Sequence, residues 1–274
     1  MREIDPYELV VRWYLRFNGY LGVENFVVHK QVKGGIGQGG ETDVLAVRFP
    51  HSRELPGFVI ENDPKLLDKD AVRDGLVDFV VAEVKGGRTD SLNRVWRPPV
   101  DEIKIDCVSY LLRWLGPLAD ETEIQDAAKE LQASHRIRCG GVIFRLIVFT
   151  HAVRPRLRIT QVTFRDIAHF LVHVRAPSWQ DRGIGSRSPH DQWHPIIKDL
   201  WKLADPQAPL GADDKIQAIL KYLRKPLFQS KAPVEPPNNA LERTVPVVMR
   251  RTMGRPRSTR SVKTPSHPVG GTRK

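Results

Sequence analysis

The first apolar pattern along the chain has the spacing of a helix. Between residues 6 and 18, large apolar side chains recur every three to four positions, which is the period of an amphipathic helix. Asp5 and Pro6 stand at its start, where Asp favours the N-cap position and Pro the first helical position. The sequence therefore predicts a helix over residues 6–18 that Gly19 and Gly22 bring to an end.

Shorter apolar runs between polar or glycine-rich residues predict strands. The predicted strands cover residues 26–32, 41–49, 78–85, 141–150 and 156–164. The runs at 78–85 and 141–150 are apolar on both faces, which is typical of strands in the middle of a sheet. The glycine-rich residues 34–40 are expected to form a loop, and residues 50–77 an insertion with a short helix at 65–75.

The remaining periodic segments predict helices. They cover residues 100–115, 122–134, 165–176, 194–204 and 213–225. One helix, three strands, two helices, two strands and three helices then follow one another, an order that favours a mixed α/β domain with an extra helical part. We expect an α/β domain over residues 1–176, a helical extension over 177–228 and a tail over 229–274.

The charge of the chain changes the picture only at its C-terminal end. The formal net charge is +11, and residues 231–274 alone hold ten Lys or Arg, two acidic residues and seven prolines. A segment with so few apolar residues cannot bury enough surface to fold, so we expect a disordered basic tail. A solvated extension is the simpler interpretation of this tail, and non-specific binding of polyanions is the alternative.

Cysteine usage and hydropathy indicate a soluble protein of a reducing compartment. The two cysteines, Cys107 and Cys139, are too few for a disulfide framework and are expected to be reduced thiols. The first residues lack the pattern of a signal peptide. The longest apolar stretch, residues 140–153, is too short to span a bilayer and contains Arg145. The sequence therefore predicts a cytoplasmic protein without membrane contact.

Residues that could form a catalytic or metal-binding site lie at the end of the predicted strand 78–85. Side chains alternate along a strand, so Glu83 and Lys85 share one face, as do Glu41 and Asp43 on the preceding strand. If these strands are neighbours, Asp43 lies beside Glu83, and two adjacent carboxylates repel unless a cation lies between them. Oxygen ligands of this kind select Mg²⁺ or Mn²⁺. Solvated charges at a sheet edge are the competing interpretation.

These residues carry a resemblance to a known family. Asp43, followed by Glu83-Val84-Lys85 on the next strand, resembles the signature of the PD-(D/E)XK, or restriction-endonuclease-like, nuclease superfamily. The resemblance implies an αβββαβ core with a mixed central sheet over residues 5–175. It also implies Mg²⁺- or Mn²⁺-dependent hydrolysis of nucleic acid, with DNA as the expected substrate. The sequence departs from the family pattern in having Thr42 before Asp43, and in the separation of 40 positions from Asp43 to Glu83.

The resemblance also assigns roles to individual residues. It implies that Asp43 and Glu83 hold the metal and that Lys85 orients the attacking water or stabilises negative charge on the phosphate. Many members carry an acidic residue in the first helix, and Glu8 stands there as a further candidate metal ligand. A carboxylate in a first helical turn is also favoured by the helix dipole alone, so both interpretations of Glu8 stay open. A catalytically inactive nucleic-acid-binding protein on the same fold is the alternative function.

A basic and aromatic segment follows the candidate site. Arg88, Arg94 and Arg97 are candidate contacts to nucleic acid, because arginines next to an aromatic ring suit phosphate and base contacts. Trp96 fits either a base contact or packing under the helix that follows.

Two other motifs receive less support. The run GIGQGG at 35–40 matches the dinucleotide pattern, but a strand is predicted to follow it where a phosphate site needs a helix. The run HDQWH at 190–194 has the spacing of a zinc-protease helix, but Pro189 and Pro195 flank it. A nucleotide-binding enzyme and a zinc hydrolase are therefore minor alternatives.

Overall fold

The computed structural model describes residues 5–32, 35–52, 61–86, 91–180 and 193–225. Within these ranges the chain has an α/β fold built on one mixed, open sheet of six strands. The strands are β1 (Leu21–Val32), β2 (Gly35–Arg48), β3 (Val77–Lys85), β4 (Arg136–Cys139), β5 (Val142–Thr150) and β6 (Thr160–Thr163). The predicted mixed α/β class is confirmed. The predicted tail at 229–274 lies outside the described residues.

The sheet order is β1-β2-β3-β5-β4, and β6 also pairs with β5. Strands β1, β2 and β3 are antiparallel neighbours, whereas β3 and β5 run parallel, as do β5 and β6. Because β3 and β5 are central, they need apolar residues on both faces, as their sequences have. Parallel pairing also brings the ends of β3 and β5 to the same edge of the sheet, with Lys85 opposite Thr150.

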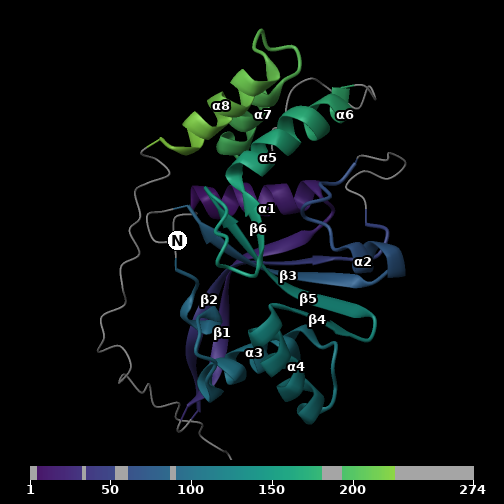
Figure 1. The fold of residues 1–274 in the computed structure, drawn as a ribbon, viewed down its shortest axis with the longest axis vertical. Helices are drawn as coiled ribbons and strands as arrows, with labels where there is room; N and C mark the ends of the chain where they lie inside the picture. Colours follow the sequence, from purple (N-terminus) through teal and green to yellow (C-terminus); the bar gives the residue numbers. More distant parts are fainter. Residues whose placement is uncertain (1–4, 33–34, 53–60, 87–90, 181–192, 226–274) are drawn as a thin grey trace, which may run out of the picture. The chain divides into compact units, whose positions relative to one another are not determined.

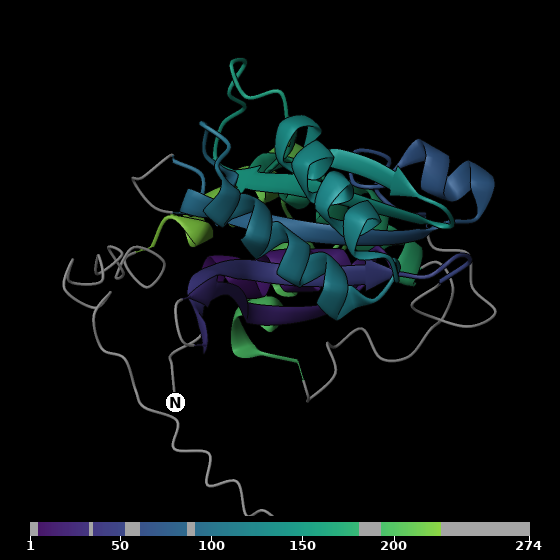
Figure 2. The same cartoon turned by 90° about the horizontal axis from the view of Figure 1, so that it is seen from below.

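Helices cover both faces of the sheet (Figure 1). Their bounds are α1 (Pro6–Phe17), α2 (Lys69–Asp74), α3 (Glu102–Leu115), α4 (Glu121–Ser134), α5 (Phe164–Phe170), α6 (Ala176–Gln180), α7 (Pro195–Ala204) and α8 (Ala212–Leu223), with a 3₁₀ turn η1 (Arg94–Trp96) and a π-helical turn η2 (Leu171–Arg175). Figure 2, seen from below, shows α3 and α4 lying across the strands on one face. Helix α1 covers the other face, and α5, α7 and α8 pack around it.

Helix α1 begins where the sequence predicts. The Asp5 side chain accepts a hydrogen bond from the Tyr7 amide at 2.8 Å, and Pro6 occupies the first turn. The chain then turns at Gly19, where φ is +85°, a conformation that glycine adopts without strain. Gly22 does not end the helix, because it already lies in β1.

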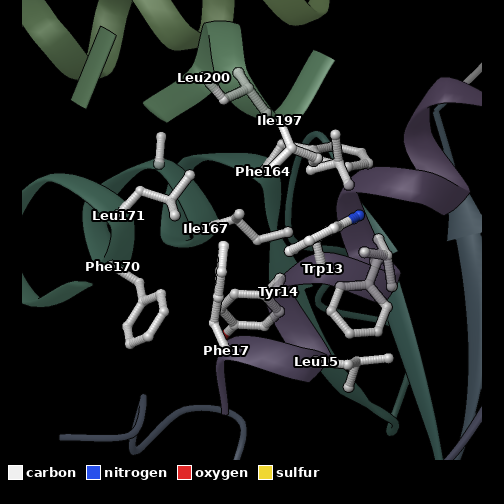
Figure 3. Packing of buried hydrophobic residues seen from close by; sticks show 14 of the residues in the cluster. Trp13, Tyr14, Leu15, Phe17, Phe164, Ile167, Phe170, Leu171, Ile197 and Leu200 are labelled. Carbon is white, nitrogen blue, oxygen red and sulfur yellow. The ribbon is translucent and has the colours of Figure 1, made fainter. Parts of the chain in front are cut away.

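The hydrophobic core on the α1 side is rich in aromatic residues. Figure 3 shows Trp13, Tyr14 and Phe17 of α1 facing Ile167 of α5 and Leu200 of α7. The proposed helical extension and the preceding α/β part therefore share this hydrophobic cluster. This packing fixes α1 on the sheet.

One glycine-rich segment was predicted incorrectly. Residues 35–40, expected to be a loop, form the first half of β2, so the β1–β2 hairpin is longer than predicted. The glycines have a packing role: a Cβ on Gly39 would lie 2.4 Å from Cys107 Sγ of α3, and one on Gly40 would lie 3.0 Å from the Val95 side chain. Close approach of α3 and η1 to the sheet thus requires residues without side chains.

The second half of the sheet also differs from the prediction. The predicted strand 156–164 shrinks to β6 at Thr160–Thr163, and β4 was not predicted. Residues 156–159 belong instead to the connection that precedes β6, and β4 is too short to show an alternating pattern. The short helix expected at 65–75 is α2 at Lys69–Asp74.

Two smaller predictions can be compared with the structure. Cys107 and Cys139 are free thiols, as expected. Among the helices in the described ranges, none has the length and apolar character needed to cross a bilayer.

Candidate functional site

The sheet register brings the predicted acidic residues to one place. The last pair between β2 and β3 joins Val44 to Ala82, and the same register continued by one residue sets Asp43 opposite Glu83. Val44 and Ala82 point into the α1 side of the core, whereas Leu45 and Val81 point into the α3–α4 side. Alternation therefore directs Asp43, Glu83 and Lys85 toward the face that α3 and α4 cover.

Glu83 is a fully buried carboxylate with two donors on one oxygen. Its side chain is 0% exposed, and Lys85 Nζ lies 2.7 Å from Glu83 Oε2. The backbone amide of Asn93 donates to the same oxygen at 2.9 Å. Its other oxygen, Oε1, is buried and has no hydrogen-bond partner among the described residues. A buried carboxylate oxygen without a donor is costly, so this atom is where a ligand would be stabilised most.

Asp43 lies beside this pair within β2, one residue beyond the last pair between β2 and β3. Its Oδ2 accepts a hydrogen bond from the Val84 amide at 2.6 Å. Burial, and next the negative charge of Glu83, raise the pKa of Asp43 to about 7, although the Lys85 ammonium and the Val84 amide act in the opposite direction. One ammonium therefore does not compensate two neighbouring carboxylates, and the site retains an affinity for further positive charge.

Asn93 is a site residue that the sequence analysis missed. Its Nδ2 donates to the Glu41 carbonyl at 2.5 Å, and its Oδ1 accepts from the Val95 amide at 3.4 Å. These bonds hold the segment before η1 on β2 and aim the Asn93 amide at Glu83. An Asn ahead of a short apolar turn is a recognisable N-cap, but its contact with Glu83 depends on the packing of η1 over the sheet.

The role of Asn93 can be tested with two substitutions. Its φ of −54° is compatible with proline, so Asn93→Pro removes the amide donor together with the side chain, whereas Asn93→Ala keeps the amide. We expect Asn93→Ala to lower the free energy of unfolding by about 1 kcal/mol through loss of the cap. Asn93→Pro should lower it by a further 1–3 kcal/mol or so, because Glu83 loses a donor. Urea denaturation in EDTA measures both, and equal values for the two variants would contradict the proposed contact.

The donor set is compatible with a hard divalent cation. Asp43 and Glu83 could supply oxygen ligands from neighbouring strands, and Mg²⁺ is commonly held by one or two carboxylates while it keeps several waters. Within the described ranges, no three His, Cys, Asp or Glu side chains form a group placed to hold a metal. Glu8 lies in the first turn of α1, half-buried, so its role as a third ligand stays a prediction.

The predicted nucleic-acid contacts are only partly covered by the described residues. Arg94 and Arg97 are exposed at the two ends of η1, beside the segment that covers Glu83. Arg88 lies outside the described residues. Trp96 is only 3% exposed and packs with the α3–α4 side of the core. Of the two interpretations of Trp96, a base contact or packing, the structure therefore favours packing.

Two minor alternatives lose their structural basis. Residues 35–40 form a strand that continues through Arg48, so they do not lead into the helix N-terminus that a dinucleotide site requires. His194 is the N-cap of α7, where it accepts a hydrogen bond from the Ile196 amide, so it does not lie within the helix that a zinc-protease motif requires. His190 lies outside the described residues.

Comparison with known proteins gives no relative: no family model, curated protein or solved structure matches this chain.

Proposed function

We propose that this protein is a Mg²⁺-dependent nuclease that hydrolyses phosphodiester bonds of DNA, with Asp43, Glu83 and Lys85 as its catalytic residues. The observation that carries the proposal is the buried Glu83–Lys85 pair with the Asp43 carboxylate next to it. Two carboxylates and one ammonium at the end of a central strand form a site with an unmet demand for a cation. Mn²⁺ would satisfy the same ligands.

Each residue has a role that follows from its contacts. Asp43 and the free oxygen of Glu83, Oε1, would hold the cation, which when bound lowers the pKa of water and polarises the phosphate. Lys85 would lie beside the reacting phosphate, where its ammonium orients the attacking water or stabilises developing negative charge. Asn93 would keep Glu83 Oε2 occupied, so that Oε1 stays directed toward the ligand.

The order of elements supports a restriction-endonuclease-like core. Helix α1 is followed by the antiparallel strands β1, β2 and β3, with α2 between the last two, then by α3, α4 and the short strand β4, and then by β5 parallel to β3. Apart from α2, β4 and the second of the two helices, this order agrees with the αβββαβ order that the resemblance implies, and the candidate residues lie on β2 and β3. Fold alone does not determine activity, so the proposal depends on the site.

A cleavage assay tests the proposal directly. The full chain should be incubated with labelled single-stranded and duplex DNA, and with RNA, in Mg²⁺, in Mn²⁺ and in EDTA. We expect cleavage of DNA with either cation and none in EDTA. Absence of metal-dependent cleavage from all substrates would refute the enzymatic proposal.

A catalytically inactive nucleic-acid-binding protein is the second candidate. One observation favours it: the described residues contain no metal-binding group of three acidic, His or Cys side chains. Titration calorimetry with Mn²⁺ separates the two functions, because the nuclease requires saturable metal binding that Asp43→Asn abolishes. The binding-only protein should retain its affinity for nucleic acid without any such metal site.

A further inference from the structure

The connection between β5 and β6, residues 151–159, lies at the same edge of the sheet as the candidate site. Lys85 pairs with Thr150, the last residue of β5, so the connection begins one residue beyond that pair. The His151 ring nitrogen Nε2 lies 3.3 Å from the carbonyl oxygen of Gly86, the residue after Lys85. Figure 1 shows the connection at the end of the sheet that lies away from α2.

This connection is held in a defined shape. Gln161 of β6 accepts a hydrogen bond from the Arg154 amide at 2.8 Å and donates to the Arg154 carbonyl at 2.9 Å and to the Leu157 carbonyl at 3.1 Å. Ile159 and Leu157 pack into the α3–α4 side of the core, which also contains Val148 of β5, the strand partner of Glu83. The loop is therefore anchored to the same layer as the site.

The outer side of this loop is positively charged. Arg156 and Arg158 flank the inward-facing Leu157 and are exposed, and neither forms an ion pair within the described residues. The loop itself contains no acidic residue. Six other arginines in the described ranges are paired with carboxylates: Arg12, Arg73, Arg113, Arg136, Arg138 and Arg145. Arg156 and Arg158 add two exposed guanidinium groups to the edge of the candidate site, where Arg94 and Arg97 are also exposed.

We propose that the 151–159 loop is a binding surface for the sugar-phosphate backbone of a nucleic acid, with Arg156 and Arg158 contacting phosphates beside the candidate site. This inference rests on the proposed function for the identity of the polyanion. Guanidinium groups suit phosphate because they present several donors in a fixed plane and stay charged. A loop anchored by Gln161 loses little conformational freedom on binding, so its contacts contribute to affinity with little ordering cost.

The distance between the 151–159 loop and the Glu83–Lys85 pair follows from the order of the strands in the sheet. Strand β6 is separated from β3 only by β5, and neighbouring strands lie about 4.8 Å apart, so the loop is roughly 10 Å from the Glu83–Lys85 pair. Along one strand of a duplex, successive nucleotides rise by about 3.4 Å. The loop should therefore contact phosphates about three nucleotides to one side of the cleaved bond. The η1 segment with Arg94 and Arg97 borders Glu83 from the β2 side and would contact the other side.

Binding measurements on the full chain test the proposal without depending on cleavage. The variant Arg156→Gln/Arg158→Gln should be compared with the control Lys69→Gln/Lys221→Gln, which removes two exposed cations from α2 and α8 and so changes the net charge equally. Fluorescence anisotropy with a labelled DNA duplex in EDTA gives the affinity over a range of salt concentrations. We expect the arginine variant to bind on the order of tenfold more weakly than the control at low salt, with a salt slope lower by about 2.

Duplexes of decreasing length test the reach of the loop. The difference between the arginine variant and the control should shrink once the duplex is too short to span both the Glu83–Lys85 pair and the loop. Equal affinities and salt slopes for the two variants would overturn the proposal. Binding is measured in EDTA, so this test does not depend on cleavage. If the protein shows no nuclease activity but its DNA affinity still depends on Arg156 and Arg158, the proposed enzymatic function is refuted and the proposed binding surface is retained.

Discussion

Lys85→Met is expected to reduce metal-dependent DNA cleavage by about 10²–10³-fold, the usual cost of removing one group that stabilises transition-state charge. Lys85 Nζ lies 2.7 Å from Glu83 Oε2 at the end of β3, so its ammonium is placed beside any phosphate bound there. DNA affinity should fall by less than about threefold, because one cation among many phosphate contacts contributes little to binding. Single-turnover cleavage and anisotropy binding, measured in parallel, separate the two effects.

The same substitution has a structural consequence that needs its own control. Glu83 is fully buried, and without Lys85 it would be an uncompensated carboxylate, which costs about 3–5 kcal/mol. The double variant Glu83→Gln/Lys85→Met should recover most of this stability in EDTA, because it removes both charges, and should still be inactive. Lys129→Met, at an exposed position of α4, controls for loss of a lysine. A folded Lys85→Met protein as active as wild type would remove Lys85 from the mechanism.

Much of the fold follows from local sequence patterns because its elements are strongly periodic. Helix α1 has both an N-cap and an amphipathic face, and β3 and β5 have continuous apolar runs. The first half of β2 could not be predicted in this way. Gly35 and Gly39 indicate a loop by composition, yet Gly39 is required where Cys107 of α3 comes against the strand. The contact that determines this conformation is between residues far apart in the chain.

The candidate site shows the same division. Alternation within β3 predicted that Glu83 and Lys85 would share a face, and the ion pair between them agrees with this. The position of Asp43 depends on the pairing of β2 with β3, which the sequence suggested only through the resemblance. Asn93 could not be assigned, because its amide meets Glu83 only after η1 has packed on the sheet. Residues that act through backbone groups leave no pattern in side-chain chemistry.

Asp43→Asn is expected to abolish cleavage and, in EDTA, to stabilise the protein at neutral and alkaline pH. Cleavage should be lost because a charged metal ligand is removed. Stability should rise because the folded protein, in which the Asp43 pKa is about 7, must hold this carboxylate ionised above that pH. An asparagine oxygen can still accept the hydrogen bond from the Val84 amide, so the local structure is kept. At about 1.4 kcal/mol per pKa unit, the gain has an upper limit of about 4 kcal/mol.

The sign of the pH dependence follows from proton binding in the two states. The Asp43 pKa is raised from 3.8 to about 7 on folding, so between these values the folded protein binds more protons than the unfolded chain. Stability of the metal-free wild type should therefore fall as pH rises from about 4 to about 7. The gain from Asp43→Asn should be absent near pH 4, grow through this window and level off above pH 7.

A matched control should show the opposite sign. Burial alone would raise the pKa of Asp68, but hydrogen bonds from Arg136 and the Ala71 amide outweigh it and the pKa is lowered. Asp68→Asn should therefore destabilise the protein at neutral pH, with a loss that diminishes as the pH falls through the lowered Asp68 pKa. Urea denaturation of wild type and both variants in EDTA, at several pH values between about 2 and 8, gives the three curves. Parallel curves for wild type and Asp43→Asn would show that Asp43 does not carry the excess charge of the site, and the proposed cation site would lose its electrostatic basis.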